Sequence, residues 1–370
     1  MSRLKVLTIF GTRPEAIKMA PVIRQLKLDP QHFDVHVCVT AQHRQMLDQV
    51  LTLFNIQPDV DLDIMKPNQS LADLTAAIFS RLDAVIRDVR PDWVLAQGDT
   101  TTVMVASLLA FYNRSRFGHV EAGLRTGDKW QPFPEEINRR VAGVVADMHF
   151  APTDWSRQNL LHEHIPDSNI FVTGNPVIDA LQWVARQPYP EGELEKLGLS
   201  AGKRTVLITA HRRENFGTPL EEVFHAIKQL ADMYAGNVNF IYPVHMNPNV
   251  QEPAHRILGN VPNIKLLPPL DYLPLVQILK RSALVLTDSG GLQEEAPGLG
   301  VPVLVLRDVT ERPEGVQAGT VRLVGTDRQK IVATASLLLN DPKEHQAMSK
   351  AVNPYGDGHA AERIAQALGG

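Results

Sequence analysis

The stretch LTDSGGLQEE, residues 286–295, carries the clearest structural signal in the chain. An apolar run ends in a turn of small residues and passes directly into a predicted helix whose first turn carries paired glutamates. A strand, a glycine turn and a helix N-terminus together form an anion site, because free backbone N–H groups and the helix dipole both point at bound phosphate. Glu295 lies about one helical turn beyond Gly291, where its carboxylate can accept hydrogen bonds from ribose hydroxyls. The stretch therefore predicts a nucleotide site without a GxGxxG motif or a Walker lysine. The alternative is an ordinary strand–helix turn with glutamates that complement the dipole.

The length and composition of the chain limit which classes of protein it can belong to. A chain of 370 residues is too long for one typical core, so two domains are expected. Its hydrophobic content of 44% and charged content of 21% are those of an ordinary soluble globular protein. The net charge of −4 gives no electrostatic reason to expect nucleic acid or an acidic membrane as a partner. Cys38, the single cysteine, is predicted to be a buried strand residue and excludes an internal disulfide. No signal peptide or membrane span is visible, so we expect the protein in the cytoplasm.

Short apolar runs rich in β-branched residues alternate with longer helical patterns along most of the chain. Such alternation predicts an α/β protein with parallel strands and helices on both faces of each sheet. Five to six strands are expected before Gly174 and a similar number after Lys203, which favours two doubly wound, Rossmann-like domains over one large sheet or a closed barrel. The clearest runs are residues 5–10, 35–39, 93–96, 118–120, 170–172, 205–209, 238–242, 264–267, 283–286 and 301–306.

The domain boundary is expected at residues 173 and 174. The first domain then spans residues 1–173 and the second spans residues 174–358, while the final helical pattern, residues 359–370, is expected to pack back on the first domain. The proline- and glycine-rich residues 187–192 are the best linker candidate. Ligands of doubly wound sheets bind beyond the carboxyl ends of the strands, so two facing domains predict an active site in the interdomain cleft.

The first strand is followed by a turn that carries two cations. Thr12 and Glu15 match a capping box, so helix initiation alone explains part of this segment. Arg13 and Lys18 have no such structural need. A cation near a helix N-terminus opposes the dipole, so Arg13 is predicted to meet an anionic ligand.

Three candidate acid–base carboxylates follow strand ends. Asp99 ends the 93–96 run, where it could also be only a helix N-cap. Glu121 lies just past the 118–120 run. Glu135 and Glu136 open a helix, where each could form a plain i,i+4 pair with an arginine. Singly these residues favour a structural role, but jointly Asp99, Glu121 and Glu135 place three carboxylates at one edge of one sheet.

The second half contributes a histidine and an arginine, each placed after a strand. His211 can donate to phosphate or transfer protons, although a lone histidine is more often structural. Arg312 is a further candidate ligand contact. Metal binding is not expected, because the 13 histidines show no HExxH motif or His/Cys ligand spacing.

Six short motifs occur in the following order: FGTRPE (residues 10–15), GDTT (98–101), HVEAGLR (119–125), PEE (134–136), HRRE (211–214) and DSGG (288–291). In this order they resemble the non-hydrolysing UDP-N-acetylglucosamine 2-epimerase family. No single motif is specific, but the ordered set is, and the resemblance covers essentially the whole chain. It implies a glycosyltransferase-B-like architecture and reversible C2 epimerisation of UDP-GlcNAc to UDP-ManNAc. The reaction would proceed by anti elimination of UDP to 2-acetamidoglucal and readdition, without a cofactor.

The same resemblance implies roles for individual positions. In place of the glutamine and the phenylalanine that approach the uridine in such patterns, this chain has Leu270 and Leu275. The catalytic set implied is Asp99, Glu121 and Glu135 as acid–base carboxylates with His211, and the ligand contacts implied are Arg13, Lys18, Asp99, Glu121, His211, Ser289, Gly290, Gly291, Glu295 and Arg312.

Further implications concern regulation, assembly and pathway. Many bacterial members bind a second UDP-GlcNAc as an allosteric activator, and Gln42, His43, Gln45, Gln69 and His245 resemble that site. The family also suggests a homodimer and a supply of ManNAc units for surface polysaccharide. Three other functions stay open: a hydrolysing 2-epimerase that releases ManNAc and UDP, a glycosyltransferase of the same architecture, and a catalytically silent nucleotide-sugar sensor. Retention of all three carboxylates disfavours the sensor.

Overall fold

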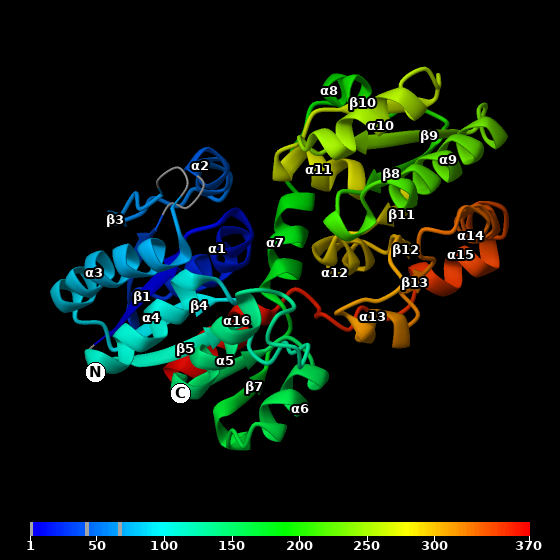
Figure 1. Ribbon diagram of the computed structural model, residues 1–370. Coiled ribbons are helices and arrows are strands. Elements are labelled where there is room, and N and C mark those ends of the chain that lie inside the picture. Colours follow the sequence, from blue (N-terminus) through cyan, green and yellow to red (C-terminus); the bar gives the residue numbers. More distant parts are fainter. Residues whose placement is uncertain (1–2, 41–43, 66–68) are drawn as a thin grey trace. The chain divides into compact units, whose positions relative to one another are not determined.

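The computed structural model describes residues 3–40, 44–65 and 69–370 and divides into two compact units. The first unit comprises Met1–Ala180 with Tyr355–Gly370, and the second comprises Leu181–Pro354. Each unit contains one parallel sheet covered by helices, so the predicted α/β class with two Rossmann-like domains is confirmed (Figure 1). The chain leaves the first unit within helix α7 (Pro176–Ala185), a few residues beyond the expected boundary and before the expected linker.

Seven parallel strands form the sheet of the first unit within the described residues, in the order β3-β2-β1-β4-β5-β6-β7. The strand order reverses between β1 and β4, which is where doubly wound sheets bind ligands. The residues that follow these two strands and β5 therefore lie at the binding edge. The strands are β1 (Leu4–Phe10), β2 (Phe33–Val39), β3 (Val60–Asp61), β4 (Trp93–Gln97), β5 (Arg116–Val120), β6 (Met148–Ala151) and β7 (Ile170–Val172).

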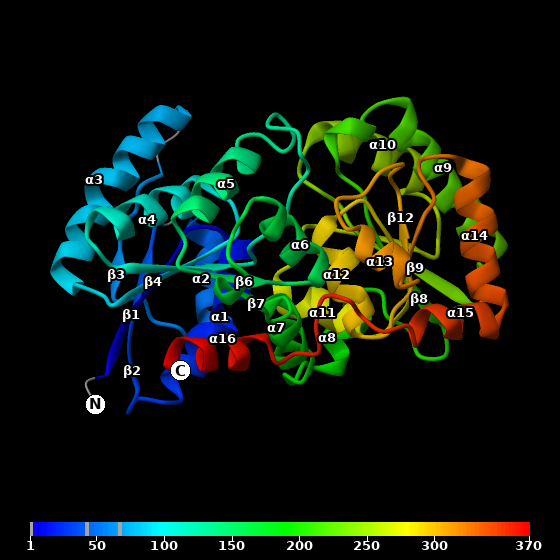
Figure 2. The same ribbon diagram turned by 90° about the horizontal axis from the view of Figure 1, so that it is seen from below.

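Helices cover both faces of the first sheet. The helices α3, α4 and α5 lie on one face, and α1 and α16 lie side by side on the other (Figure 2). Helix α16 is anchored there because the N–H groups of Ala360 and Ala361 donate to the carboxylate of Asp179 at 3.2 and 2.9 Å. The helices are α1 (Arg13–Lys27), α2 (Arg44–Leu53), α3 (Leu71–Val89), α4 (Thr101–Tyr112), α5 (Glu135–Val145), α6 (Asp154–His162), α7, α16 (Ala360–Gly369) and the short η1 (Asp167–Asn169).

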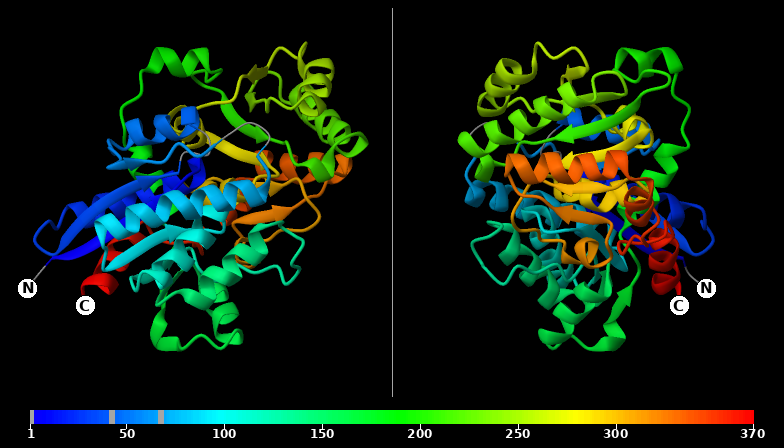
Figure 3. Two further views of the ribbon diagram at one scale, coloured as in Figure 1. Left: turned by 60° about the vertical axis from the view of Figure 1, so that its left-hand side comes forward. Right: turned by 90° about the vertical axis from the view of Figure 1, so that its right-hand side faces the viewer.

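The second unit repeats the same design with six parallel strands in the order β10-β9-β8-β11-β12-β13. The order again reverses at the centre, between β8 and β11. Figure 3 shows these strands between layers of helices. The elements are β8 (Arg204–Thr209), β9 (Val238–Pro243), β10 (Ile264–Leu267), β11 (Ser282–Thr287), β12 (Val303–Val305), β13 (Val321–Leu323), α8 (Glu191–Lys196), η2 (Arg213–Asn215), α9 (Thr218–Met233), α10 (Pro248–Leu258), α11 (Tyr272–Leu279), α12 (Gly290–Gly298), α13 (Pro313–Gln317), α14 (Arg328–Asn340) and α15 (Pro342–Ser349).

Three strands were not among the predicted runs: β3, β6 and β13. Each is at most four residues long, and charged or imidazole side chains interrupt β6 and β13, so neither is a continuous apolar run. Strand β12 is shorter than the predicted 301–306 run, which contains Pro302, a residue without the N–H that a ladder needs. Cys38 lies buried in β2, as predicted, and burial raises the pKa of its thiol to about 12. Among the described residues, no helix combines the length and apolar character required to cross a bilayer.

Candidate active site

The turn between β1 and α1 contributes the first candidate site residues of the first unit. The predicted capping box is present: the Thr12 hydroxyl accepts from the Glu15 N–H, and the Glu15 carboxylate accepts from the N–H groups of Gly11 and Thr12 at 2.8 and 2.7 Å. The carboxylate is buried, and burial raises its pKa. Arg13, at the first helical position, is half-buried at the binding edge of the sheet.

Asp99 follows β4 and does not cap the next helix. The N-cap of α4 is Thr100, so the interpretation of Asp99 as an N-cap is wrong. The carboxylate lies 3.5 Å from the Arg139 guanidinium. Burial raises the pKa of Asp99 to about 6; the Arg139 charge opposes this rise, and Glu121 and Glu135 add to it. Asp99 therefore has a proton affinity suited to acid–base chemistry near neutral pH.

Glu121 is held by donors from α1, β4 and the turn before α7. Its backbone φ of 62° is left-handed, which is uncommon for a residue with a side chain. The Lys18 ammonium lies 2.5 Å from Oε1, the Asn175 amide donates to the same oxygen at 2.8 Å, and the Gln97 amide donates to Oε2. Only 6% of the residue is exposed. These donors fix the carboxylate in place and stabilise its negative charge.

The start of α5 holds two glutamates with different environments. Glu136 is fully buried, accepts from the N–H groups of Thr126 and Gly127, and lies 3.3 Å from Arg140, the predicted i,i+4 partner. This residue is a structural anchor for the loop before the helix. Glu135 is half-buried and lies close enough to Asp99 to raise its pKa. The structure thus brings the three predicted carboxylates into one electrostatic group.

In the second unit, His211 follows β8 and lies against Asp288, the residue that follows β11. The Nδ1 atom of the imidazole is 3.6 Å from Oδ1 of the fully buried carboxylate. The ring of His245 stacks on His211, with centroids 5.2 Å apart and planes at 13°. Burial lowers the pKa of His211; Asp288 opposes this, and His245 and Arg212 add to it.

The N-terminus of α12 lies in the stretch that the sequence predicts to be a nucleotide cradle. The helix begins at Gly290 with Ser289 as its N-cap, and neither a side-chain cap nor an acidic residue occupies its first turn. The expectation of paired glutamates in the first turn is therefore wrong, because the helix begins earlier than the pattern implied. Its N–H groups are left without a side-chain cap, which suits an anion. The Arg312 guanidinium contacts the same end, 3.0 Å from the position that a Cβ on Gly290 would take.

The two glutamates of α12 lie further along the helix. Glu294 is buried and accepts from Arg312 Nε at 2.6 Å, so it orients the guanidinium. Glu295 accepts from the Tyr272 hydroxyl at 3.2 Å and has an oxygen 3.5 Å from the Cβ position of Gly291. Leu270 and Leu275, at the predicted uridine positions, are both half-buried near the start of α11.

The residues predicted for a second nucleotide sugar are contributed by both units of the chain. Gln42 and His43 lie outside the described residues. Gln45 lies in α2 and Gln69 lies just before α3, both in the first unit, while His245 is an exposed residue of the second unit, stacked on His211. Within the second unit, His245 therefore lies beside His211.

Four residues around these sites were not singled out from the sequence: Gln97, Asn175, Tyr272 and Asp288. Each places a polar group on a predicted site residue, and the sequence alone does not indicate any of these contacts. The partners of Gln97, Tyr272 and Asn175 lie 24, 23 and 54 positions away in the chain. Among the described residues, no group of three or more His, Cys, Asp or Glu side chains converges as a metal site.

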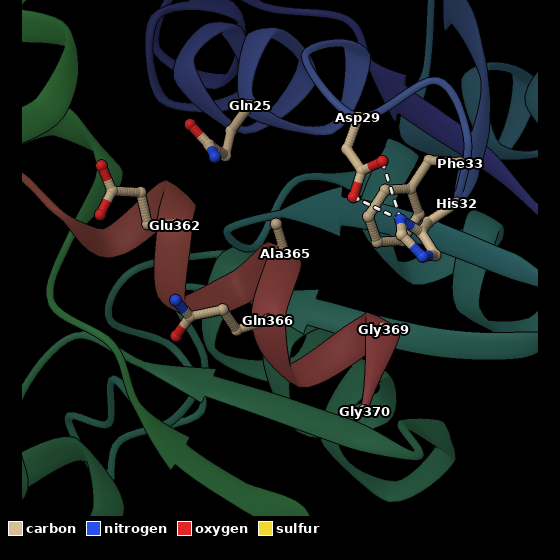
Figure 4. Close-up of a pocket in the computed structure, with 9 residues that line it drawn as sticks. All are labelled: Gln25, Asp29, His32, Phe33, Glu362, Ala365, Gln366, Gly369 and Gly370. Carbon is tan, nitrogen blue, oxygen red and sulfur yellow. Dashed lines mark hydrogen bonds and ion pairs between the residues drawn. The ribbon is translucent and has the colours of Figure 1, made fainter.

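A separate cavity of about 520 Å³ lies in the first unit between α1 and α16. Gln25, Asp29, His32 and Gln366 are among its lining residues (Figure 4). It includes Phe33, the first residue of β2, and so lies at the amino edge of the sheet. None of the predicted catalytic or ligand residues lines this cavity.

Comparisons with known proteins agree with the geometry. Residues 24–369 match the family model described as UDP-N-acetylglucosamine 2-epimerase. The chain is 57% identical over 371 residues to the UDP-N-acetylglucosamine 2-epimerase of Salmonella typhimurium, covering 99% of this chain and 98% of the relative. A crystal structure of UDP-GlcNAc 2-epimerase from Neisseria meningitidis bound to UDP-GlcNAc is similar, with a TM-score of 0.90, 49% identity and 99% coverage of both chains. The Methanocaldococcus jannaschii enzyme in complex with UDP-GlcNAc and UDP gives a TM-score of 0.80, 32% identity and 99% coverage of both chains.

Proposed function

Because the chain belongs to the UDP-N-acetylglucosamine 2-epimerase family, we propose that it interconverts UDP-GlcNAc and UDP-ManNAc by inverting C2 of the sugar. The observation that carries this proposal is the cluster of three carboxylates, Asp99, Glu121 and Glu135, in the first unit. Asp99 has a pKa raised to about 6, and Glu121 is fixed by Lys18, Asn175 and Gln97. Proton transfer at C2 needs a group that can both take and return a proton near neutral pH.

The reaction divides naturally into elimination and readdition. In elimination, a base takes the C2 proton, the C1–O bond breaks with its electron pair going to UDP, and 2-acetamidoglucal forms. Readdition of UDP to C1 with a proton delivered to the opposite face of C2 gives the epimer. We assign proton transfer to Asp99 with Glu135 beside it, and stabilisation of positive character at C1 to Glu121. No electrons are gained or lost overall, so the reaction needs no redox cofactor.

Groups of the second unit suit the UDP end of the substrate. Breaking the C1–O bond places additional negative charge on the diphosphate, which must be stabilised for elimination to proceed. The uncapped N-terminus of α12, the Arg312 guanidinium and His211 are the donors for that charge. Glu295, held by Tyr272, is placed about one turn into α12 to accept from ribose hydroxyls.

Incubation of the purified protein with UDP-GlcNAc tests the proposal, with UDP-ManNAc as the expected product by chromatography. Asp99→Asn, Glu121→Gln and Glu135→Gln should each lower turnover by orders of magnitude while UDP binding survives. The control is Asp88→Asn, an exposed acidic residue of α3, which should turn over like wild type. Unchanged turnover in all three site variants would refute the assignment of these carboxylates to catalysis. Free ManNAc and UDP as products would indicate the hydrolysing reaction instead.

Finer proposals rest on family membership. We propose that the protein acts in the cytoplasm as a homodimer, that it supplies ManNAc units for surface polysaccharide, and that a second UDP-GlcNAc activates it through residues including Gln69. Turnover of UDP-ManNAc should then require added UDP-GlcNAc. Strictly hyperbolic turnover of UDP-ManNAc without UDP-GlcNAc would count against activation.

A further inference from the structure

Asp288 is a buried carboxylate with one oxygen fully used and one unused. No part of the residue is exposed. Its Oδ2 accepts from the backbone N–H groups of His211 and Arg212 at 2.7 and 2.8 Å, which fixes the chain after β8. Its Oδ1 is buried and has no hydrogen-bond partner among the described residues. A buried carboxylate oxygen without a donor is costly, so it indicates a contact that forms in another state of the protein.

The group that faces this oxygen is the imidazole of His211. Its Nδ1 lies 3.6 Å from Oδ1, beyond hydrogen-bond range but within reach of a small ring rotation. The side chain of His211 is 36% exposed, so the other edge of the ring is open to a ligand. Asp288 is therefore placed to orient the His211 ring through Nδ1, as a carboxylate orients the imidazole of a catalytic histidine.

Without a ligand, the surroundings favour the neutral imidazole. Burial lowers the pKa of His211 below its ordinary value of 6.5, and the stacked His245 ring and the Arg212 guanidinium add to that effect. Asp288 acts in the opposite direction. On the far side of this carboxylate, the Tyr242 hydroxyl donates to the Ala210 carbonyl and not to Asp288. An anion bound at the ring would act in the same direction as Asp288 and favour the protonated imidazole.

We propose that Asp288 makes His211 a proton-coupled diphosphate ligand. When the diphosphate of UDP binds, the imidazole takes one proton from solvent. Its Nδ1–H then donates to the unused Oδ1 of Asp288, and its Nε2–H donates to a phosphate oxygen. This inference rests on the proposed function, because it takes UDP as the ligand. It makes Asp288 a positioning residue that acts through His211 and has no contact with the substrate.

Proton uptake during UDP binding tests the proposal. Titration calorimetry at about pH 7.5, in buffers that differ in ionisation enthalpy, should show uptake of about one proton by wild type. His211→Asn should abolish the uptake, which separates the imidazole from the phosphate groups of UDP itself. Asp288→Asn keeps an oxygen for the two backbone N–H groups but turns an N–H donor toward Nδ1, which favours the neutral ring. This variant should bind UDP about tenfold more weakly, with the uptake lost.

A matched control is Asp341→Asn. Asp341 also accepts from two backbone N–H groups, those of Lys343 and Glu344, and asparagine is an equally good N-cap. This variant should keep the uptake. Uptake that survives in Asp288→Asn, or wild type that binds UDP without uptake, would overturn the inference. If Asp288→Asn does not fold, nitrogen NMR of wild type with UDP decides: both ring nitrogens of His211 must carry protons, and a neutral ring would overturn the inference. Failure of UDP to bind wild type would instead overturn the proposed function, and this inference with it.

Discussion

Replacing Asn175 by serine should impair catalysis while largely sparing the fold. The Asn175 amide donates to Glu121, at 2.8 Å from Oε1, and its own oxygen accepts from the N–H of Val177 at 3.1 Å at the start of α7. Serine can still accept from that N–H as an N-cap, but it is too short to reach Glu121. A hydrogen bond to a charged group contributes about 1.5–3 kcal/mol. Since each 1.36 kcal/mol is about tenfold in rate, kcat/KM should fall by about 10- to 100-fold.

The assay pairs steady-state turnover of UDP-GlcNAc with UDP affinity and thermal unfolding. Asn175→Ser should lower kcat, retain UDP affinity, and unfold near the wild-type temperature. Asn175→Ala loses the N-cap as well as the donor, so it should match the serine variant in kcat but lose about 1 kcal/mol more stability. Wild-type kcat in a folded Asn175→Ser protein would refute the assignment of Glu121 as a carboxylate held in place for catalysis.

Four further results are expected. The rate of epimerisation should fall on acidification with an apparent pKa near 6, because the ionised form of Asp99 must take the C2 proton; a rate that stays constant down to about pH 5 would contradict this. Burial raises the pKa of Asp99 to about 6, above its value in the unfolded chain, so wild type loses stability as pH rises through about 6 and the carboxyl ionises. Asp99→Asn removes this loss. The variant should therefore have a higher Tm than wild type at neutral pH but not at acidic pH. Gly290→Ala should place a Cβ 3.0 Å from the Arg312 guanidinium and push the guanidinium aside. The Kd for UDP should then rise several-fold without loss of stability. Unchanged affinity by calorimetry would refute the assignment of the N-terminus of α12 as the diphosphate site. Tyr272→Phe should free the Glu295 carboxylate and weaken UDP binding about fivefold, because this long hydrogen bond of 3.2 Å contributes about 1 kcal/mol. Equal affinities would count against the ribose role of Glu295.

The fold was largely predictable because buried parallel strands are nearly continuous apolar runs. Strand β7 (Ile170–Val172) and strand β10 (Ile264–Leu267) have the predicted limits, and their neighbours differ by a few residues at the ends. The short strand β6 escaped prediction because His149 lies within it, where the imidazole is buried and neutral, with a pKa lowered to about 4 mainly by burial. A polar residue inside a buried strand removes the only signal that such a short run has.

The site was predictable to the extent that topology brings strand ends together. Asp99, Glu121 and Lys18 each follow or adjoin a strand end, and the sheet order places them side by side. Their positioning residues were not predictable in the same way. Asn175 reaches Glu121 across 54 positions of sequence, and Asp288 reaches His211 across 77, so neither spacing follows a helix or strand period. Only the folded chain shows these contacts.

Deuterium exchange at C2 tests the central claim most directly. Proton NMR of the purified protein with UDP-GlcNAc in D2O, without an added cofactor, follows the sugar protons of both epimers as the reaction approaches equilibrium. If the carboxylates of the first unit remove the C2 proton and return one, the product is UDP-ManNAc. Deuterium should then appear at C2 of both UDP-ManNAc and recovered UDP-GlcNAc. UDP-ManNAc that retains its C2 proton, or bound UDP-GlcNAc that never changes, would contradict the account.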